Sequence, residues 1–329
     1  TALGGSAVKN VLGSHPSESL QACAQEPSAT LRDCGTAPAI SGIQSWFDTP
    51  GNGPLVPADL AGKVVLVDFW AYSCINCQRA IVHTEAWYSA YRAAGLVVVG
   101  VHTPEYAFEH VAGNIQAGAR RLGITYPVAI DNNYVTWNNF GNNSWPASYL
   151  IDSTGHIRHV AIGEGDYSTD ESLIRQLLSA AHPGVSLPPA TGVKDTTPTD
   201  QNQTPESYLG AQRANSYAGG PLTNGTRSFT YPATVPQNAF ALSGSWTVTD
   251  EALTAGAGAG IRLSFTAANV YLDVSGTGTL TVTVDGATKS YPVTGAPNIY
   301  TLVGRASPEQ AVLTVTLSPG LSAYSFTFG

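Results

Sequence analysis

Two hydrophobic patterns alternate through the first half of the chain. Residues 64–69 and 96–101 are continuous apolar runs of strand length, as expected for strands that are buried on both faces. Residues 77–94 and 107–122 have helical spacing of their apolar side chains, although the second of these segments contains two glycines. The pattern therefore predicts alternating strands and helices in this part of the chain.

The segments that follow predict a hairpin and a closing helix. Residues 147–151 and 156–162 flank the sequence DSTG, which is typical of hairpin turns. Residues 170–181 have the spacing of an amphipathic helix. Taken with the preceding strands and helices, this order predicts an α/β unit built on a mixed sheet.

A polar segment rich in proline separates this unit from the rest of the chain. Between His182 and Glu206 there are five prolines and no hydrophobic period of either kind. Such a segment cannot bury enough apolar surface to offset its ordering entropy, so we expect it to be extended or to lie along a surface. We predict an N-terminal extension at 1–36, an α/β domain at 37–182, a linker at 183–204 and a second domain at 205–329.

Short runs with β-like composition fill the second domain. The turns between them are rich in Gly, Pro, Asn and Asp, and Asp285-Gly286 is a strong hairpin signal. Residues 281–285 alternate between polar and apolar side chains, which indicates one solvated and one buried face. The pattern predicts an antiparallel, all-β sandwich. Strands are expected at 228–231, 245–249, 261–265, 270–275, 279–284, 299–303, 312–317 and 323–328.

Composition excludes several classes of function. The chain has 329 residues, a net charge of −8 and only 12% charged residues, and no basic cluster extends beyond Arg120-Arg121, which argues against nucleic-acid binding. No apolar run approaches the ~18 residues of a membrane-spanning helix, so we expect a soluble protein. The chain starts at Thr1 and contains no Met, which indicates that it is processed or cut from a longer chain.

The chemistry of the chain is concentrated in Cys74-Ile75-Asn76-Cys77, directly after a predicted buried strand and at the start of a predicted helix. Unpaired N–H groups and a partial positive charge at a helix N-terminus stabilise a thiolate. Cys74 is then the exposed attacking thiol, and Cys77, one turn further on, resolves the mixed disulfide. A structural disulfide and half of a zinc site are the alternatives, but zinc needs four ligands and none of the required spacing is present.

These residues carry a resemblance to known proteins. Residues 67–77 (VDFWAYSCINC) look like the active-site strand and helix of thioredoxins, especially their membrane-tethered, TlpA-like branch. Residues 99–105 (VGVHTPE), 163–167 (GEGDY), 204–210 (TPESYLG) and the FTFG end narrow the resemblance. The chain resembles the extracytoplasmic C-terminal part of the DipZ family, bacterial proteins of cytochrome c biogenesis type.

The resemblance implies a thioredoxin fold followed by a jelly-roll-like β-sandwich similar to carbohydrate-binding modules. It also implies a CcdA-type membrane domain in the same full-length chain, which tethers the protein at the outer side of the membrane and supplies electrons. The implied partners are exported proteins with disulfides and, for the second domain, carbohydrate. No cofactor or metal is implied. The Ile75-Asn76 dipeptide departs from the Gly-Pro of ordinary thioredoxins, so a thioredoxin-like potential does not carry over.

Two carboxyl groups are candidates for proton transfer at the cysteine pair. Asp68 lies six residues before Cys74 in a strand that is otherwise apolar, where burial raises the pKa of a carboxyl. It matches the buried acid of thioredoxins by position, and we expect it to take the proton of Cys77. Glu105 follows the second buried strand and is a second candidate. A strand-edge Asp68 and a solvated Glu105 are the plain structural alternatives.

The thioredoxin resemblance also implies a substrate-binding surface. Thioredoxin-like folds place a cis-proline before the strand at 147–151, which makes Trp145-Pro146 the expected platform for an extended substrate segment. Tyr72 and Ser73 precede Cys74 and are expected to complete this surface. His83 and His102 are interpreted as structural histidines.

Cys23 and Cys34 lie in a polar segment ahead of the predicted fold. An exported chain with an even number of cysteines favours a structural disulfide between them. The alternative is a second redox pair that exchanges with Cys74.

The first hypothesis is thus an extracytoplasmic thiol-disulfide oxidoreductase, acting as a reductase. One alternative is a cell-envelope glycan-binding or docking module with a secondary redox role. The other is a thiol peroxidase. Seven aromatic residues are candidates for sugar stacking in the second domain, although core packing is their commoner role: Tyr217, Tyr231, Trp246, Tyr271, Tyr291, Tyr300 and Tyr324.

Overall fold

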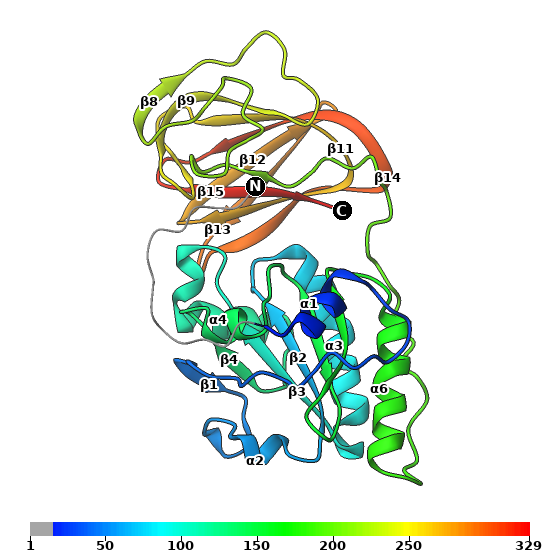
Figure 1. The fold of residues 1–329 in the computed structure, drawn as a ribbon. Helices are drawn as coiled ribbons and strands as arrows, with labels where there is room; N and C mark the ends of the chain where they lie inside the picture. Colours follow the sequence, from blue (N-terminus) through cyan, green and yellow to red (C-terminus); the bar gives the residue numbers. More distant parts are fainter. Residues whose placement is uncertain (1–15) are drawn as a thin grey trace. The chain divides into compact units, whose positions relative to one another are not determined.

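The computed structural model describes residues 16–329, in two compact units with a boundary between Asp195 and Thr196 (Figure 1). The first part of the predicted N-terminal extension, residues 1–15, lies outside the described residues. Among the described residues, no helix has the length and apolar character needed to cross a membrane.

The first unit is built on the mixed sheet that the sequence predicts. Its six strands run in the order β1-β4-β3-β2-β5-β6, with β2, β3 and β4 parallel and the other pairings antiparallel. Every residue of the central strand is buried, because helices cover both of its faces, and its near-continuous apolar sequence follows from this. The strands are β1 (Ser45–Phe47), β2 (Val64–Trp70), β3 (Leu96–His102), β4 (Val128–Ile130), β5 (Ala147–Ile151) and β6 (Ile157–Ile162).

The helices of this unit are α1 (Glu18–Gln25), α2 (Pro57–Leu60), α3 (Ile75–Tyr91), α4 (Ala112–Arg121), α5 (Val135–Asn139) and α6 (Tyr167–Ala181). Short 3-10 segments lie at Pro50–Asn52, Arg92–Ala94 and Ala107–His110. The prediction of one helix over 107–122 is wrong, because Val111 adopts an extended conformation between the last 3-10 segment and α4.

A close approach to Tyr72 explains why α4 contains a glycine, Gly118, at a buried position. A Cβ atom there would lie 2.7 Å from Cβ and Cγ of Tyr72, so only glycine lets the helix approach this ring. At Gly113, in contrast, a Cβ atom would meet no heavy atom within 4 Å, so this position could carry a side chain.

The N-terminal segment is part of the first unit's structure. Backbone hydrogen bonds join Arg32 and Cys34 to Arg158 and Ile157 of β6, so residues 32–36 extend the edge of the sheet. Leu20 of α1 is buried in the hydrophobic core of the first unit. The linker segment has no helix or strand between residues 185 and 200 and lies along α6, where Thr191 donates two hydrogen bonds to Glu171.

The second unit is an all-antiparallel β structure without helices in its described residues, as the sequence predicts. Its sheet runs in the order β13-β12-β14-β11-β15-β10-β9-β8, and β7 pairs with β15. The strands are β7 (Ser207–Tyr208), β8 (Gly225–Phe229), β9 (Phe240–Val248), β10 (Leu253–Ala255), β11 (Gly260–Ser275), β12 (Gly278–Val284), β13 (Ala287–Val293), β14 (Asn298–Leu317) and β15 (Ser322–Phe328).

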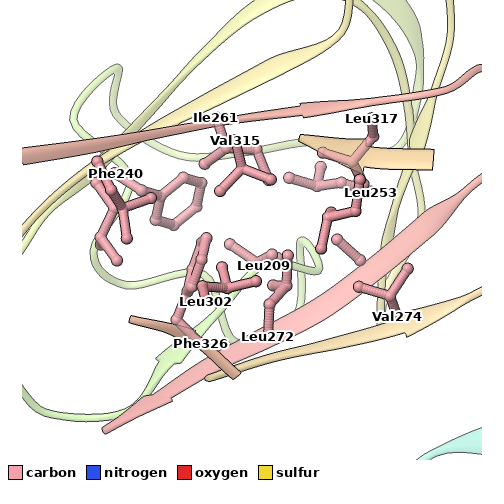
Figure 2. Close-up of a cluster of buried hydrophobic side chains, with 14 of the residues drawn as sticks. Leu209, Phe240, Leu253, Ile261, Leu272, Val274, Leu302, Val315, Leu317 and Phe326 are labelled. Atoms are coloured by element: carbon pink, nitrogen blue, oxygen red, sulfur yellow. The ribbon is translucent and has the colours of Figure 1, made fainter. Parts of the chain in front are cut away.

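Two long strands fold this sheet over its own core. β11 pairs with β9 through its first half and with β15 through its second half, while β14 follows it along both, with register shifts near Asn269. Figure 2 shows the result: Ile261 and Val315 point toward Leu272 and Phe326 across an apolar interior. Four of the predicted runs are thus halves of two strands, because a bulge bends a strand without ending it.

Candidate active site

The central strand delivers the cysteine pair to the start of a helix. β2 ends at Trp70, and Cys74 immediately precedes Ile75, the first residue of α3. Cys74 is half-buried and Cys77 is buried. The first turn of α3 has no acidic side chain, so the partial positive charge of the helix N-terminus is not neutralised from within that turn. This places an accessible thiol and an inaccessible one within a single helical turn.

Asp68 lies in the interior, on the fully buried strand β2. Burial raises the pKa of Asp68 from 3.8 to about 7, and a hydrogen bond with Thr84 opposes part of this effect. Its Oδ2 atom has no hydrogen-bond partner among the described residues. Burial also raises the pKa of Tyr126, and the charges of Asp68 and Cys77 add to that effect, so all three groups share one buried environment. Asp68 is therefore a carboxyl group able to bind or release a proton near neutral pH.

The loop after β3 carries Glu105 and is held by several hydrogen bonds. The backbone N–H of Glu105 donates to Oε2 of Glu109 at 2.6 Å, and the N–H of Tyr106 donates to the same oxygen at 3.3 Å. Glu109 is completely buried, whereas Glu105 is half-buried. No role was predicted for Glu109 from the sequence, in which it lies within the helix expected over 107–122.

Trp145 and Pro146 are joined by a cis peptide bond, as the fold resemblance implies. The half-buried Trp145 ring packs on Trp137 with 4.4 Å between ring centroids. Its indole N–H donates to the carbonyl of Thr103 at 2.9 Å, and the Tyr134 hydroxyl donates to the next carbonyl, that of Pro104. The segment before β5 and the segment after β3 are therefore fixed to each other.

Tyr72 and Ser73 differ from their expected place on a substrate surface. Both are buried, and the Tyr72 ring stacks on His102 and packs against Gly118 of α4. His102 accepts a hydrogen bond at Nε2 from the backbone N–H of Tyr72, and burial lowers the pKa of this histidine to about 3. A neutral His102 thus holds the turn that leads to Cys74, in keeping with the structural role predicted for it.

Arg79, two residues after Cys77, connects Asn76 to a distant loop. Its guanidinium pairs through Nε and a terminal nitrogen with both carboxylate oxygens of Glu164, at 2.6 and 2.8 Å. The same terminal nitrogen donates to Oδ1 of Asn76 at 2.7 Å. Sequence reasoning identified Glu164 only as part of the GEGDY motif and missed Arg79, although an Arg at i+3 from a residue between the cysteines was the available signal.

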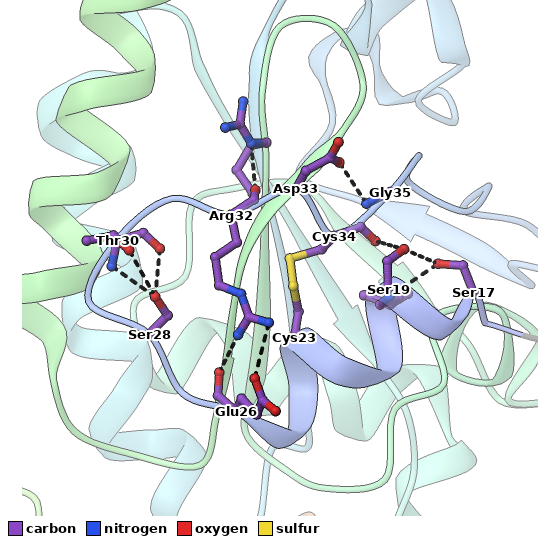
Figure 3. Close-up of a disulfide and its surroundings, with 12 residues drawn as sticks. Ser17, Ser19, Cys23, Glu26, Ser28, Thr30, Arg32, Asp33, Cys34 and Gly35 are labelled. Carbon is purple, nitrogen blue, oxygen red and sulfur yellow. Dashed lines mark hydrogen bonds and ion pairs between the residues drawn. A yellow bond between two sulfur atoms is a disulfide. The ribbon is translucent and has the colours of Figure 1, made fainter.

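Cys23 and Cys34 are joined by a disulfide between α1 and the segment that pairs with β6 (Figure 3). Both residues are buried, with 4% and 1% of their surface exposed. Around them Arg32 donates to the carbonyl and carboxylate of Glu26, and Ser19 donates to the carbonyl of Cys34. A buried disulfide surrounded by such local bonds acts as a staple of the N-terminal segment.

The first unit combines this strand order with a cis-proline ahead of β5 and a Cys-X-X-Cys pair at a helix N-terminus, as a thioredoxin-like fold does. The chain thus has a thioredoxin-like unit followed by an additional β unit. Its residues 48–160 match the AhpC/TSA family, and residues 204–329 match the family described as thioredoxin like C-terminal domain.

More particularly, the chain is homologous to Protein DipZ of Mycobacterium bovis. The two are 50% identical over 306 residues, which is 92% of this chain and 44% of that protein. The chain thus spans less than half the length of this relative.

Other relatives match the first part of the chain. Thiol-disulfide oxidoreductase YkuV of Bacillus subtilis is 29% identical over 143 residues, which is 43% of this chain and 93% of that protein. Among solved structures, "Solution Structure of a Thioredoxin-like Protein in the Oxidized Form" is 27% identical and covers 46% of this chain and 98% of its own, with a TM-score of 0.40.

Proposed function

We propose that this chain is a thiol-disulfide oxidoreductase and works as a reductase, which passes two electrons from Cys74 and Cys77 to disulfides of exported proteins. One observation carries the proposal: the half-buried Cys74 lies at a helix N-terminus and the buried Cys77 lies one turn further on. This difference in exposure lets only one of the two sulfurs meet a protein substrate.

The exchange then has two steps. The Cys74 thiolate attacks one sulfur of a substrate disulfide, and the other substrate sulfur leaves as a thiolate that takes up a proton. Cys77 next gives its proton to the Asp68 carboxylate and attacks Sγ of Cys74, which releases the second substrate sulfur. The substrate gains two electrons and two protons, and the protein is left with a Cys74–Cys77 disulfide.

The remaining site residues have supporting roles in this proposal. Glu105, half-buried on the loop after β3, is a second carboxylate that exchanges the proton with solvent. Trp145 and Pro146 bind an extended substrate segment beside Cys74. Cys23 and Cys34 form a structural disulfide that takes no part in the exchange.

Regeneration of the dithiol needs a reductant on the same side of the membrane. We propose a CcdA-type membrane domain in the full-length chain as this donor, and hence an extracytoplasmic, membrane-tethered location. Homology to DipZ supports this proposal, because the matched relative has more than half of its length outside the region shared with this chain. We also keep as a proposal the division of the chain into an extension at 1–36, an α/β domain at 37–182, a linker at 183–204 and a β domain at 205–329.

The direction of transfer is tested by the equilibrium potential of the Cys74/Cys77 couple in glutathione mixtures. A reductase is expected to have a potential at or below roughly −230 mV, whereas a value near that of a strong oxidant, about −120 mV, would reverse the assignment. Insulin reduction should be lost in Cys74→Ser. Faster turnover with hydrogen peroxide than with insulin would favour the peroxidase alternative.

A glycan-binding role for the second unit is a separate proposal that needs an accessible aromatic side chain. Trp246 is excluded as a platform because it is fully buried, and its indole N–H donates to Ser243. Tyr231 is half-buried and lies 4.2 Å from the Arg262 guanidinium, which leaves it as a candidate. Binding of the intact chain to cell-wall glycan that is lost in Tyr231→Ala would support this role, and equal binding would remove Tyr231 from it.

A further inference from the structure

The ion pair between Arg79 and Glu164 is less exposed than the Arg158–Asp152 pair of the first unit and has bidentate geometry. Its side chains are only 13% and 8% exposed, and the two groups meet through two parallel N–H···O bonds. Bidentate, partly buried pairs of this kind fix geometry as well as charge. The Arg158–Asp152 pair in the same unit is 32% and 13% exposed, and its two groups meet at 3.1 Å.

The pair is connected to the segment between the two cysteines. Side chains in an α-helix lean toward the N-terminus, so Arg79 reaches back over the first turn of α3 and donates to Asn76 at 2.7 Å. Glu164 comes from the connection between β6 and α6, which lies 85 residues further along the chain. A single guanidinium therefore ties the residue adjacent to Cys77 to a separate loop.

The position of the charge is unusual for a helix. A cation close to a helix N-terminus opposes the macrodipole, and an arginine beside a cysteine favours the thiolate. The Glu164 carboxylate neutralises Arg79 at this position. The two charges are thus balanced beside Asn76, the residue that directly precedes Cys77.

We propose that Arg79 and Glu164 are positioning residues of the thiol-disulfide exchange, which hold Asn76 in place and set the electrostatic balance at the Cys74–Cys77 pair. This inference rests on the proposed function and adds a specific device to it. It also gives the GEGDY motif a role, since Glu164 is the motif's carboxylate that reaches the helix of the cysteine pair.

The test uses the sign of the change in reactivity. In the reduced, intact chain, iodoacetamide alkylation of Cys74 is followed against pH by peptide mapping. Glu164→Gln leaves the cation unbalanced and should lower the pH midpoint by about 0.5 units, whereas Arg79→Gln leaves the carboxylate unbalanced and should raise it by a similar amount. The double variant should return close to the wild-type midpoint. Arg158→Gln is the matched control and should not move it.

Other titratable groups surround this end of the sheet from several elements. They are Asp68 on β2, His102 at the end of β3, Glu105 and Glu109 after it, and Tyr126 ahead of β4. All of them are present in every variant compared, so their effects cancel in the differences. Shifts of the same sign in both single variants, or no shift in either, would overturn the proposal.

Two further measurements keep the outcome clear. Alkylation of the buried Cys77 identifies any Gln variant that has lost its fold. In that case Arg79→Lys and Glu164→Asp replace the Gln variants. Each keeps its charge but breaks the bidentate geometry, so the midpoint should stay at the wild-type value while insulin reduction slows about threefold or more; a shifted midpoint or an unchanged rate refutes the proposal. A wild-type chain that reduces no disulfide contradicts the proposed function instead, because alkylation does not require turnover.

Discussion

Replacement of Asp68 by Asn separates the electrostatic cost of this carboxyl from its shape. Asn has nearly the same volume and keeps a hydrogen-bonding oxygen, but it cannot ionise. In the wild-type protein, burial raises the pKa of Asp68 from 3.8 to about 7. The native state therefore holds a proton that the unfolded chain releases between these two values, and the free energy of unfolding falls as the pH rises through this window.

The magnitude follows from the two pKa values. Their difference is about 3 units, and each unit corresponds to about 1.4 kcal/mol, so the stabilisation present below about pH 3.8 is lost by up to about 4 kcal/mol once the pH exceeds 7. Asp68→Asn removes this dependence. The variant should match the wild-type protein near pH 4 and exceed its stability by up to about 4 kcal/mol at pH 8. Asp131, whose pKa burial raises to about 6, titrates equally in both proteins.

Urea unfolding at pH 4 to 8 measures this difference, with thiol labelling of the buried Cys77 to identify the transition of the first unit. The transition of the second unit, which contains no Asp68, serves as an internal reference. The same variant should slow insulin reduction at neutral pH, because the group that accepts the proton of Cys77 is gone. A stability difference that is constant from pH 4 to 8 would refute the burial argument, and unchanged rates across about pH 6–9 would refute the catalytic one.

Three other changes test separate parts of the structure. Cys77→Ser should trap mixed disulfides on Cys74, since the second displacement is lost, and mass spectrometry of adducts that appear instead on Cys77 of Cys74→Ser would reverse the order of attack. Gly118→Ala should cost about 1–3 kcal/mol in thermal unfolding because its Cβ would overlap Tyr72, while Gly113→Ala, in open space, serves as the tolerated control; equal stability of the two variants would contradict this interpretation. Replacing both Cys23 and Cys34 by Ser should lower stability by about 3 kcal/mol without slowing exchange, and slower exchange at unchanged stability would favour a redox role for that pair.

The sequence was most informative where a residue's surroundings are determined by the residues next to it. The runs at 64–69 and 96–101 were recognisable as strands because strands buried on both faces have mostly apolar side chains. Asp68 is the charged exception, and we propose a catalytic role for it. For these strands local pattern and global fold agree. The cis bond at Trp145-Pro146 was predicted from the resemblance to thioredoxins and not from a local pattern.

Residues whose roles depend on distant partners could not be predicted in the same way. Tyr72 looked like a surface residue because it precedes Cys74, and only the approach of α4 at Gly118 shows that its ring is buried. β1 and β4 are three residues long and β10 is equally short, so no period identifies them. The long strands β11 and β14 were each divided because polar residues at their bends resemble turns.

The bonds between distant residues also bear on how the site discriminates among substrates. The segments around the cysteine pair are held by bonds that reach across the fold: Trp145 to Thr103, Glu109 to the N–H of Glu105, and His102 to the N–H of Tyr72. Each of these bonds fixes backbone, and none presents a charged side chain as a specific recognition group. A site of fixed backbone and one accessible sulfur selects substrates by whether an extended segment with a disulfide can reach Cys74, more than by side-chain identity. Such a site suits the proposed reduction of different exported proteins, and it leaves fine control of reactivity to Arg79 and Glu164, the positioning residues proposed above.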